Sequence, residues 1–329
     1  MRSELSFVAP VSTDLSRMRG WGVDLRRQRQ SWFGLKRSAK GFLSLGVPHA
    51  VLRFLARFVP VLRSGRLPAP ADLEEVEGRV AGATFVMLDP ARCENAKQLY
   101  WGHGRRPMAD DRLALDTVVA LARQADVFLD IGAYTGLFTL AVSAVAPAVQ
   151  VHAFEIVPAV ADALVANLVR NRVDLRVAVH REGVGEDGKT MRVPTGEGGS
   201  ALPSFFSSRM RFDEGDLVSF RSLDSVAEML PDGDRVVIKI DVEGTEDAVL
   251  GSGQAFLESF RPDILCEVLP EADGAFLDAL ITPPGLRPFL VTASKLEERP
   301  RIEPDAEHRD WLFTAKEPEE LRALGLPIG

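Results

Sequence analysis

Hydrophobic positions change their period repeatedly along the chain from residue 111 onward. Short apolar runs typical of buried strands alternate with stretches whose apolar residues recur every three or four positions, as in amphipathic helices. Helices are expected at 111–123, 136–145, 159–171, 246–260 and 272–281, and strands at 127–131, 149–154, 175–180, 235–240, 264–268, 288–291 and 311–314. This alternation predicts an α/β fold: a doubly wound, mostly parallel, seven-stranded Rossmann-like sheet with helices on both faces and ligands at the carboxyl ends of its strands.

The beginning of the chain differs from the rest in pattern and in charge. Residues 1–66 hold 13 Arg and Lys against 3 Asp and Glu, a net charge of +10, whereas the remainder holds 26 against 44, a net charge of −18. An amphipathic stripe over 51–62 predicts a short helix, and two prolines within 67–71 indicate a linker. We therefore expect a basic, partly helical N-terminal extension and linker over 1–71, and the functional domain over 72–329.

Two interpretations of the basic extension remain open. Its amphipathic stripe packs on a neighbouring domain, or its arginines make weak contact with an anionic membrane surface. Nucleic acid is not an expected partner, because the body of the chain is acidic and lacks aromatic-rich RNA-binding motifs. Directly after the linker, residues 79–88 predict a β-hairpin with its turn near Gly82.

The isolated cysteines and the lack of a signal-peptide pattern in the first 40 residues indicate a reducing compartment. Cys93 and Cys266 lie far apart, without CxxC spacing, which points to neither a disulfide framework nor a zinc site. The first 40 residues show no apolar core followed by a cleavage site. Residues 131–154 carry no formal charge over the length of a membrane span, but two glycines and Pro147 divide them into strand, helix and strand. We expect a cytoplasmic protein.

The sharpest chemical signal is a glycine loop directly after an apolar strand and before a helix. It runs from Asp130 through Gly132 and Tyr134 to Gly136. Glycines let a ligand approach the backbone, and the following helix points its amide groups toward it. A dinucleotide-binding fingerprint requires G-x-G-x-x-G. Here Tyr134 stands in place of its second glycine, so the pattern is G-x-x-x-G instead.

Glu155 follows the second strand of this unit. A carboxylate at that position accepts hydrogen bonds from both hydroxyls of an adenosine ribose. The alternative is a structural role, in which Glu155 caps the helix that begins near Pro158. The glycine loop upstream favours the ribose.

A second motif, from Val237 to Glu246, brings several charged side chains to the end of one strand. Asp241 and Glu243, joined by Glu267 from the next strand end, would repel one another and raise at least one pKa, which suits a general base. Each residue also has a structural interpretation: Glu243 orders the turn, Glu246 favours the helix N-terminus, and Lys239 neutralises its neighbours.

Metal binding is considered because clustered carboxylates and water bind magnesium. No HxxxH motif and no histidine at ligand spacing accompanies these carboxylates, so no metal is expected. His103 lies before the α/β core in the sequence. It either lines the entrance to the substrate site or is an ordinary loop histidine.

Together, the glycine loop, the segment Arg221-Ser-Leu223-Asp224 and the run Lys239-Ile-Asp241-Val-Glu243-Gly244-Thr-Glu246 resemble the FkbM family of S-adenosylmethionine-dependent O-methyltransferases. Members of that family carry a K-I-D-x-E-G-x-E signature. The resemblance covers about residues 78–316. It implies a class I methyltransferase fold, S-adenosylmethionine as cofactor, and methyl transfer to a hydroxyl of a sugar, glycan or polyketide-type natural product.

The resemblance also implies which residues form the site. The cofactor-binding residues would be Asp130, Gly132, Ala133, Tyr134, Gly136, Glu155, Ile156 and Asp241, and the catalytic residues would be Asp241, Glu243 and Glu267. In class I methyltransferases the acid before the glycine loop faces the methionine end of the cofactor, which would be the role of Asp130.

Two other functions are compatible with parts of the pattern. A nicotinamide-dependent oxidoreductase shares the sheet and the acid after its second strand, although Tyr134 argues against it. A non-catalytic protein that binds nucleic acid or a surface would use the basic extension. The interval 194–216, rich in glycine and serine but carrying aromatic residues, either covers a ligand or is a surface excursion.

Overall fold

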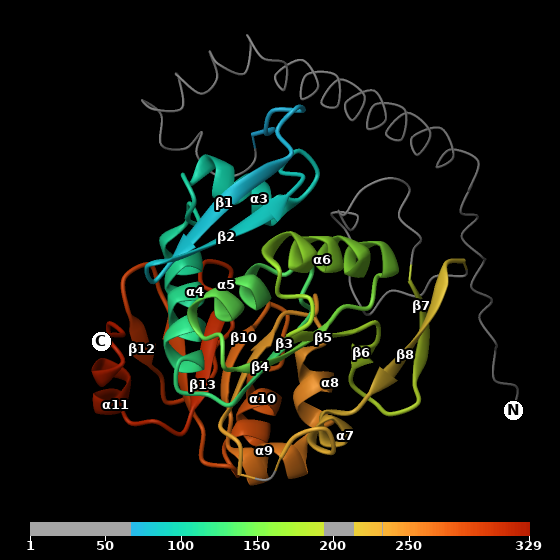
Figure 1. Cartoon of the computed structure of the whole chain (residues 1–329). Helices are drawn as coiled ribbons and strands as arrows, with labels where there is room; N and C mark the ends of the chain where they lie inside the picture. The colour runs from blue at the N-terminus through green and yellow to red at the C-terminus, as the bar shows by residue number, and fades with distance from the viewer. Residues whose placement is uncertain (1–66, 194–213, 232) are drawn as a thin grey trace, which may run out of the picture.

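The computed structural model describes residues 67–193, 214–231 and 233–329 (Figure 1). Its main element is an eight-stranded sheet in the order β12-β11-β13-β10-β9-β3-β4-β5. The strands are β3 (Val127–Ile131), β4 (Gln150–Phe154), β5 (Val177–His180), β9 (Val236–Ile240), β10 (Asp263–Glu267), β11 (Arg287–Val291), β12 (Leu296–Glu298) and β13 (Asp310–Thr314). The prediction of an α/β fold with a mostly parallel sheet is confirmed.

The direction of the strands identifies the edge of the sheet where a ligand belongs. Strands β5, β4, β3, β9 and β10 pair in parallel, and β13 pairs antiparallel with both β10 and β11. The chain builds outward from β3 to β4 and β5 on one side, and then returns to place β9 and β10 on the other. The order therefore reverses between β3 and β9, and doubly wound folds bind ligands at the carboxyl ends of strands at such a point.

Each face of the sheet is covered by its own group of helices, because successive strand residues point to opposite faces. On β3, Phe128 belongs to the core beneath α4 (Ala109–Ala122), α5 (Leu137–Val145) and α6 (Pro158–Asn171). Its neighbours Val127 and Leu129 belong to the opposite core, beneath α8 (Glu246–Gly251), α9 (Gln254–Phe260) and α10 (Gly274–Ile281). Figure 1 shows these two helical layers above and below the sheet.

A β-hairpin covers the outer side of the first helical layer. Strands β1 (Glu75–Val80) and β2 (Ala83–Leu88) pair antiparallel around a turn at Gly82, which confirms the predicted hairpin. Two side chains of α6 fasten it: the Asn171 amide pairs with both backbone groups of Val86, and Asn167 Oδ1 accepts from the Leu88 N–H. Helix α3 (Glu94–Trp101) follows the hairpin and packs against β1.

The structure differs from the sequence-based expectations in three respects. The sheet has eight strands rather than seven, because three-residue β12 adds to its edge. The helix expected over 246–260 is interrupted after α8. There the Ser252 Oγ accepts from the Leu223 N–H, and a Cβ on Gly253 would lie 2.6 Å from the Leu223 side chain. A separate small sheet also forms, in the order β6 (Gly183–Val184), β8 (Asp216–Arg221), β7 (Thr190–Val193).

Two further short helices complete these ranges, α7 (Leu223–Ala227) and α11 (Pro318–Ala323). No helix within the described ranges is both long and apolar enough to cross a membrane. The expected helix at 51–62 and most of the interval 194–216 lie outside the described residues.

Candidate active site

A cavity of about 670 Å³ lies at the edge of the sheet where the strand order reverses. Its wall includes residues that follow β3, β4 and β9, together with α3 and its N-terminal flank. Its lining includes Arg92, Lys97, Arg106, Asp130, Gly132, Ala133, Tyr134, Phe138, Phe154, Glu155, Ile156, Glu182, Val184, Phe220, Lys239, Asp241 and Glu243. Of the residues expected from the sequence, only Gly136 and Glu267 are absent from this wall.

The glycine loop passes unusually close to the end of β9. Gly132 has φ +80°, and a Cβ there would lie 1.9 Å from the backbone oxygen of Asp241. The N–H groups of Gly132 and Ala133 both donate to the Phe154 oxygen, at 3.0 and 2.9 Å. Gly136, at φ +89°, is pressed against Leu164 of α6. These glycines therefore allow the loop to pack between two neighbouring strand ends as well as to approach a ligand.

Asp130 lies at the floor of the cavity, with only 2% of its surface exposed. Its Oδ2 accepts from both the N–H and the hydroxyl of Thr139, at 3.0 and 2.6 Å. Burial outweighs these hydrogen bonds and raises the pKa of Asp130 to about 6. The carboxyl thus ties the first turns of α5 to the end of β3, beneath the space open to a ligand.

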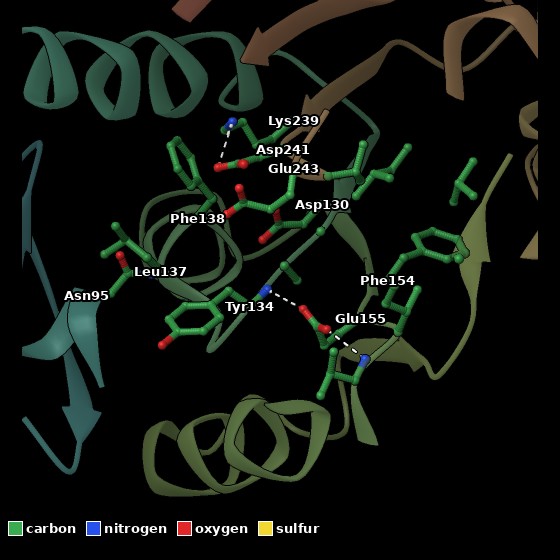
Figure 2. A pocket seen from close by; sticks show the side chains of 18 of the residues that line it. Asn95, Asp130, Tyr134, Leu137, Phe138, Phe154, Glu155, Lys239, Asp241 and Glu243 are labelled. Carbon is green, nitrogen blue, oxygen red and sulfur yellow. Dashed lines mark hydrogen bonds and ion pairs between the residues drawn. The ribbon is translucent and has the colours of Figure 1, made fainter. Parts of the chain in front are cut away.

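Glu155 is held by backbone amides on both of its oxygens (Figure 2). Oε2 accepts from the Tyr134 N–H at 2.9 Å, and Oε1 accepts from the N–H of Val157, the N-cap residue of α6, at 2.8 Å. The structural role considered from the sequence is therefore present. A carboxylate oxygen accepts two hydrogen bonds, so each oxygen keeps one acceptor position. Burial raises the pKa of Glu155 to about 7, against the effect of the two amides.

The opposite side of the cavity holds a carboxylate cluster, defined as Lys239, Asp241, Glu267 and Asp310. The Lys239 ammonium is almost fully buried, 3.5 Å from Asp241 Oδ2 and 3.9 Å from Asp310 Oδ1. It also donates to the Ile240 oxygen. Burial opposes its charge, but the surrounding carboxyl groups outweigh burial and raise the pKa of Lys239. The neutralising role considered for Lys239 matches this arrangement.

Asp241 and Glu267 hydrogen-bond to one another, and their pKa values move apart. Burial raises the pKa of Asp241, but Lys239 and the hydrogen bond from Glu267 outweigh it, so the net shift is downward. Burial and the charge of Asp241 raise the pKa of Glu267 to about 9. At neutral pH this pair carries one negative charge, on Asp241, whose side chain is 42% exposed to the cavity.

Two further acids shape the turn after β9. Glu243 adopts φ +56° and stands on the cavity wall, where partial burial of its carboxyl group and the nearby charge of Asp241 raise its pKa. Glu246 is buried, and its Oε1 accepts from the N–H groups of Val242 and Gly244, at 3.2 and 3.1 Å. Glu246 therefore holds the turn that presents Asp241 and Glu243, in addition to beginning α8.

The sequence did not predict three charged residues in or near the carboxylate cluster: Asp310, Arg106 and Asp111. Asp310 begins β13 and lies opposite Glu267 in the antiparallel register, although no motif marks it. Arg106 lines the cavity and pairs with Asp111 of α4 at 3.0 Å. His103, a candidate from the sequence, is exposed in the loop after α3 and is absent from the cavity wall.

The strand order and the cavity at its reversal point are those of a doubly wound α/β fold. The model of the Methyltransferase FkbM domain matches residues 130–312, more than half of the chain. This chain therefore belongs to the FkbM methyltransferase family, and it is an S-adenosylmethionine-dependent methyltransferase. No curated protein is similar enough to count as a match.

Several solved structures are similar to this chain at low identity. A precorrin-6y C5,15-methyltransferase from Geobacter metallireducens has 15% identity and TM-score 0.34, over 61% of this chain and 87% of that chain. An O-methyltransferase from Bacillus cereus has 12% identity and TM-score 0.36, over 61% and 78%. A methyltransferase from Agrobacterium tumefaciens has 10% identity and TM-score 0.42, over 76% and 73%. The family assignment rests on the domain match and not on these scores.

The family match distinguishes the two enzyme classes considered from the sequence: it supports a methyltransferase and not a nicotinamide-dependent oxidoreductase. The residues around the cavity suit the cofactor. Each oxygen of Glu155 keeps one free acceptor position, which fits the two hydroxyls of a ribose, and the cavity wall includes the apolar side chains of Val184 and Phe220. Among the described residues, no group of three or more histidine, cysteine or acidic side chains is arranged to hold a metal ion.

Proposed function

We propose that this enzyme is an O-methyltransferase, and that its acceptor is a hydroxyl of a sugar, glycan or polyketide-type small molecule. The observation that carries the proposal is Asp241. It is the ionised member of a carboxyl pair and is open to the cavity at the strand reversal point. A hydroxyl that is methylated must lose its proton, and an adjacent carboxylate is a suitable acceptor for it.

The cofactor half of the site consists of residues around the glycine loop. In this proposal Glu155 accepts hydrogen bonds from the ribose hydroxyls, and the backbone of the loop and Ile156 contact the nucleoside. Support comes from the two unused acceptor positions of Glu155 and from its fixed orientation. Asp130 contributes by fixing the start of α5 and by adding a carboxyl at the floor.

Bound S-adenosylmethionine supplies an electrophilic methyl group on a sulfonium. The protein has to place the acceptor oxygen in line with that group, and such positioning accounts for much of the rate of an in-line displacement. Asp241 accepts a hydrogen bond from the acceptor hydroxyl and takes its proton as the O–CH₃ bond forms. Glu243 orients the acceptor from the same wall. Asp241 is preferred to Glu267 as the base because Glu267 already holds a proton and does not line the cavity.

A polyhydroxyl acceptor suits the chemistry of this wall. Asp241 and Glu243 present carboxyl groups to the cavity, and carboxylates are hydrogen-bond acceptors that match hydroxyl donors. Among the described residues, four cations line the cavity, and each is paired with an acid: Arg92 with Asp89, Lys97 with Glu94, Arg106 with Asp111 and Lys239 with Asp241. An anionic acceptor would therefore find none of these cations without a counter-ion. A sugar or glycan hydroxyl is the acceptor that this distribution of groups favours.

The test compares Asp241→Asn with the wild-type enzyme. Methyl transfer from labelled S-adenosylmethionine is measured against a panel of saccharides and polyketide lactones, and S-adenosylhomocysteine binding is measured by calorimetry. We expect binding to change by less than about threefold and transfer to fall by about 10² to 10⁴. Glu243→Gln should lose less, or a similar amount, and Glu258→Gln on the exposed face of α9 is the control. Weaker cofactor binding with unchanged turnover at saturating cofactor would mean that Asp241 holds the cofactor instead.

A further inference from the structure

We propose that Glu267 is a positioning residue: it keeps its proton throughout the reaction and donates a hydrogen bond to Asp241, so that Asp241 enters the reaction ionised and directed at the acceptor. This inference rests on the proposed function of Asp241. It assigns to Glu267 a role opposite to that of a base: its proton is never transferred to or from the acceptor. Glu267 acts through Asp241, because it does not line the cavity.

The hydrogen bond between the two carboxyl groups requires this proton. Asp241 and Glu267 each come directly after a paired residue, Ile240 of β9 and Cys266 of β10, so the parallel register brings the two residues side by side. Two carboxylates have only acceptors, so the hydrogen bond between these side chains forms only when one of them is protonated. The position of the cations decides which one. Lys239 lies 3.5 Å from Asp241 and is almost fully buried. Arg309 lies 4.0 Å from Glu267, and its side chain is 49% exposed, so water screens its charge.

The sheet fixes this assignment through the order of three strands. Glu267 ends β10, whose parallel neighbour β9 leads into Asp241 and whose antiparallel neighbour β13 begins with Asp310. Charged and titratable groups face the pair from every neighbouring element: Lys239 from β9, Glu243 from the turn after β9, Glu246 from α8, Asp130 from β3, Cys266 from β10, Asp310 and Arg309 at β13, and Arg106 with Asp111 at α4. Lys239 forms ion pairs with Asp241 and Asp310, whereas the only ion pair of Glu267 among the described residues is with the half-exposed Arg309.

The consequence for catalysis follows from the bonds that change. The acceptor O–H bond breaks and its proton passes to Asp241, while the O–CH₃ bond forms and the S–CH₃ bond breaks. The proton of Glu267 remains in place and holds one Asp241 oxygen, and Lys239 attracts the carboxylate from the side of Oδ2. Asp241 therefore meets the acceptor in one fixed orientation and in its ionised form, which is the preorganisation that a proton acceptor needs.

The direct test is spectroscopic and needs neither cofactor nor acceptor. The full-length protein is labelled with ¹³C at glutamate side-chain carboxyl groups, and the resonance of Glu267 is identified by its loss in Glu267→Gln. We expect that resonance to titrate near pH 9. Titration in the ordinary glutamate range, near about 4 to 5, overturns the proposal. Because no methyl transfer is measured, this result is independent of whether a hydroxyl acceptor is ever found.

The kinetic test separates a donated hydrogen bond from a transferred proton. Glu267→Gln retains a donor that does not titrate, whereas Glu267→Leu has none. We expect the Gln variant to keep kcat within about threefold at pH 7.5 and to lose any alkaline limb of the wild-type profile above pH 9. The Leu variant should lose about tenfold or more in kcat, with little change in KM for S-adenosylmethionine.

Controls make each kinetic outcome decisive. Glu258→Gln removes a carboxyl from the exposed face of α9 and should leave the profile unchanged. Equal losses in the Gln and Leu variants would show that the carboxylate itself is used, and would overturn the proposal. If Glu267→Leu does not fold, as judged by thermal unfolding, the comparison of Glu267→Gln with wild type still decides, because a large loss in that variant has the same meaning.

Discussion

The two sides of the cavity hold acidic residues in opposite ways. On the cofactor side, Glu155 is bound by two backbone amides, which the fold supplies wherever the loop and the helix form. On the other side, Asp241 is bound by Lys239 and Glu267, which are side chains that need one another to keep their charges. Glu155 thus has a position set by the backbone, whereas Asp241 has a position and a charge set by a network. Glu155 should therefore keep its position when neighbouring side chains are substituted, whereas Asp241 should lose its position or its charge.

Gly132 lies where these two sides touch, and its replacement should have the largest effect. A Cβ at this residue would lie 1.9 Å from the Asp241 backbone oxygen, and its φ of +80° is unfavourable for alanine. Strain and overpacking together predict that Gly132→Ala lowers the free energy of unfolding by about 3 to 5 kcal/mol. Chemical denaturation measures this loss.

Gly82→Ala is the matched control, because Gly82 has a similar φ of +86° with nothing within 4 Å of a Cβ. It should lose only the strain, about 1 to 3 kcal/mol. Equal losses in the two variants would show that the contact with Asp241 contributes nothing, and that the two sides of the cavity are not mechanically joined at Gly132.

The side-chain network predicts the second effect. Lys239→Met leaves Asp241 and Asp310 without their shared buried counter-ion. Breaking a buried pair costs about 3 to 5 kcal/mol. Asp241 is 42% exposed, so water relieves part of this, and we expect a loss of about 2 to 4 kcal/mol in the free energy of unfolding.

The dependence on pH sharpens this second prediction. The orphaned carboxyls take up protons at low pH, so denaturation should show a larger loss at pH 8 than at pH 5.5 for Lys239→Met. Adding Asp241→Asn to it should restore part of the stability at pH 8, because one uncompensated charge is removed. Simple additivity of the two substitutions would contradict the network.

The same contrast explains what the sequence could and could not predict. The glycine loop, Glu155 and Asp241 stand directly after apolar strands, so short contiguous motifs reveal them and the sheet brings their ends together. Asp310 reaches the site only because β13 runs antiparallel beside β10, a pairing of residues far apart in the chain. The strand order was therefore needed to show that the Asp241 charge depends on a network.

Local detail was also hidden for physical reasons. The helical period continues across Ser252 and Gly253, yet the contacts of both residues with Leu223 interrupt the helix there. Strand β12 pairs with the end of β11. Its three residues are too few to show an alternating hydrophobic pattern in the sequence. Arg106 belongs to no recognisable sequence motif. Its pairing with Asp111 of α4 becomes visible only in the folded structure.

The smallest predicted effect concerns the pH dependence of cofactor binding, and it tests whether Glu155 behaves as the backbone-bound side of the comparison requires. Its pKa in the free protein is raised to about 7 by burial. Ribose hydroxyls donate to the ionised carboxylate, so binding lowers that pKa, and affinity is full above about pH 7 and falls as the pH drops below it. One linked proton corresponds to a change of up to about tenfold per pH unit in the dissociation constant of S-adenosylhomocysteine.

Calorimetry between pH 5.5 and 8 measures this slope, and Glu155→Gln isolates its source. The glutamine does not titrate, so its variant should bind more weakly at pH 8 but lose the part of the slope that belongs to Glu155. Asp130, with a pKa raised to about 6, and the amino group of the ligand remain in both proteins and cancel in the difference. Lys239→Gln, on the other side, should leave the slope intact. A slope that survives in Glu155→Gln and vanishes in Lys239→Gln would reverse the comparison, because cofactor binding would then depend on the side-chain network instead of the backbone-bound carboxylate.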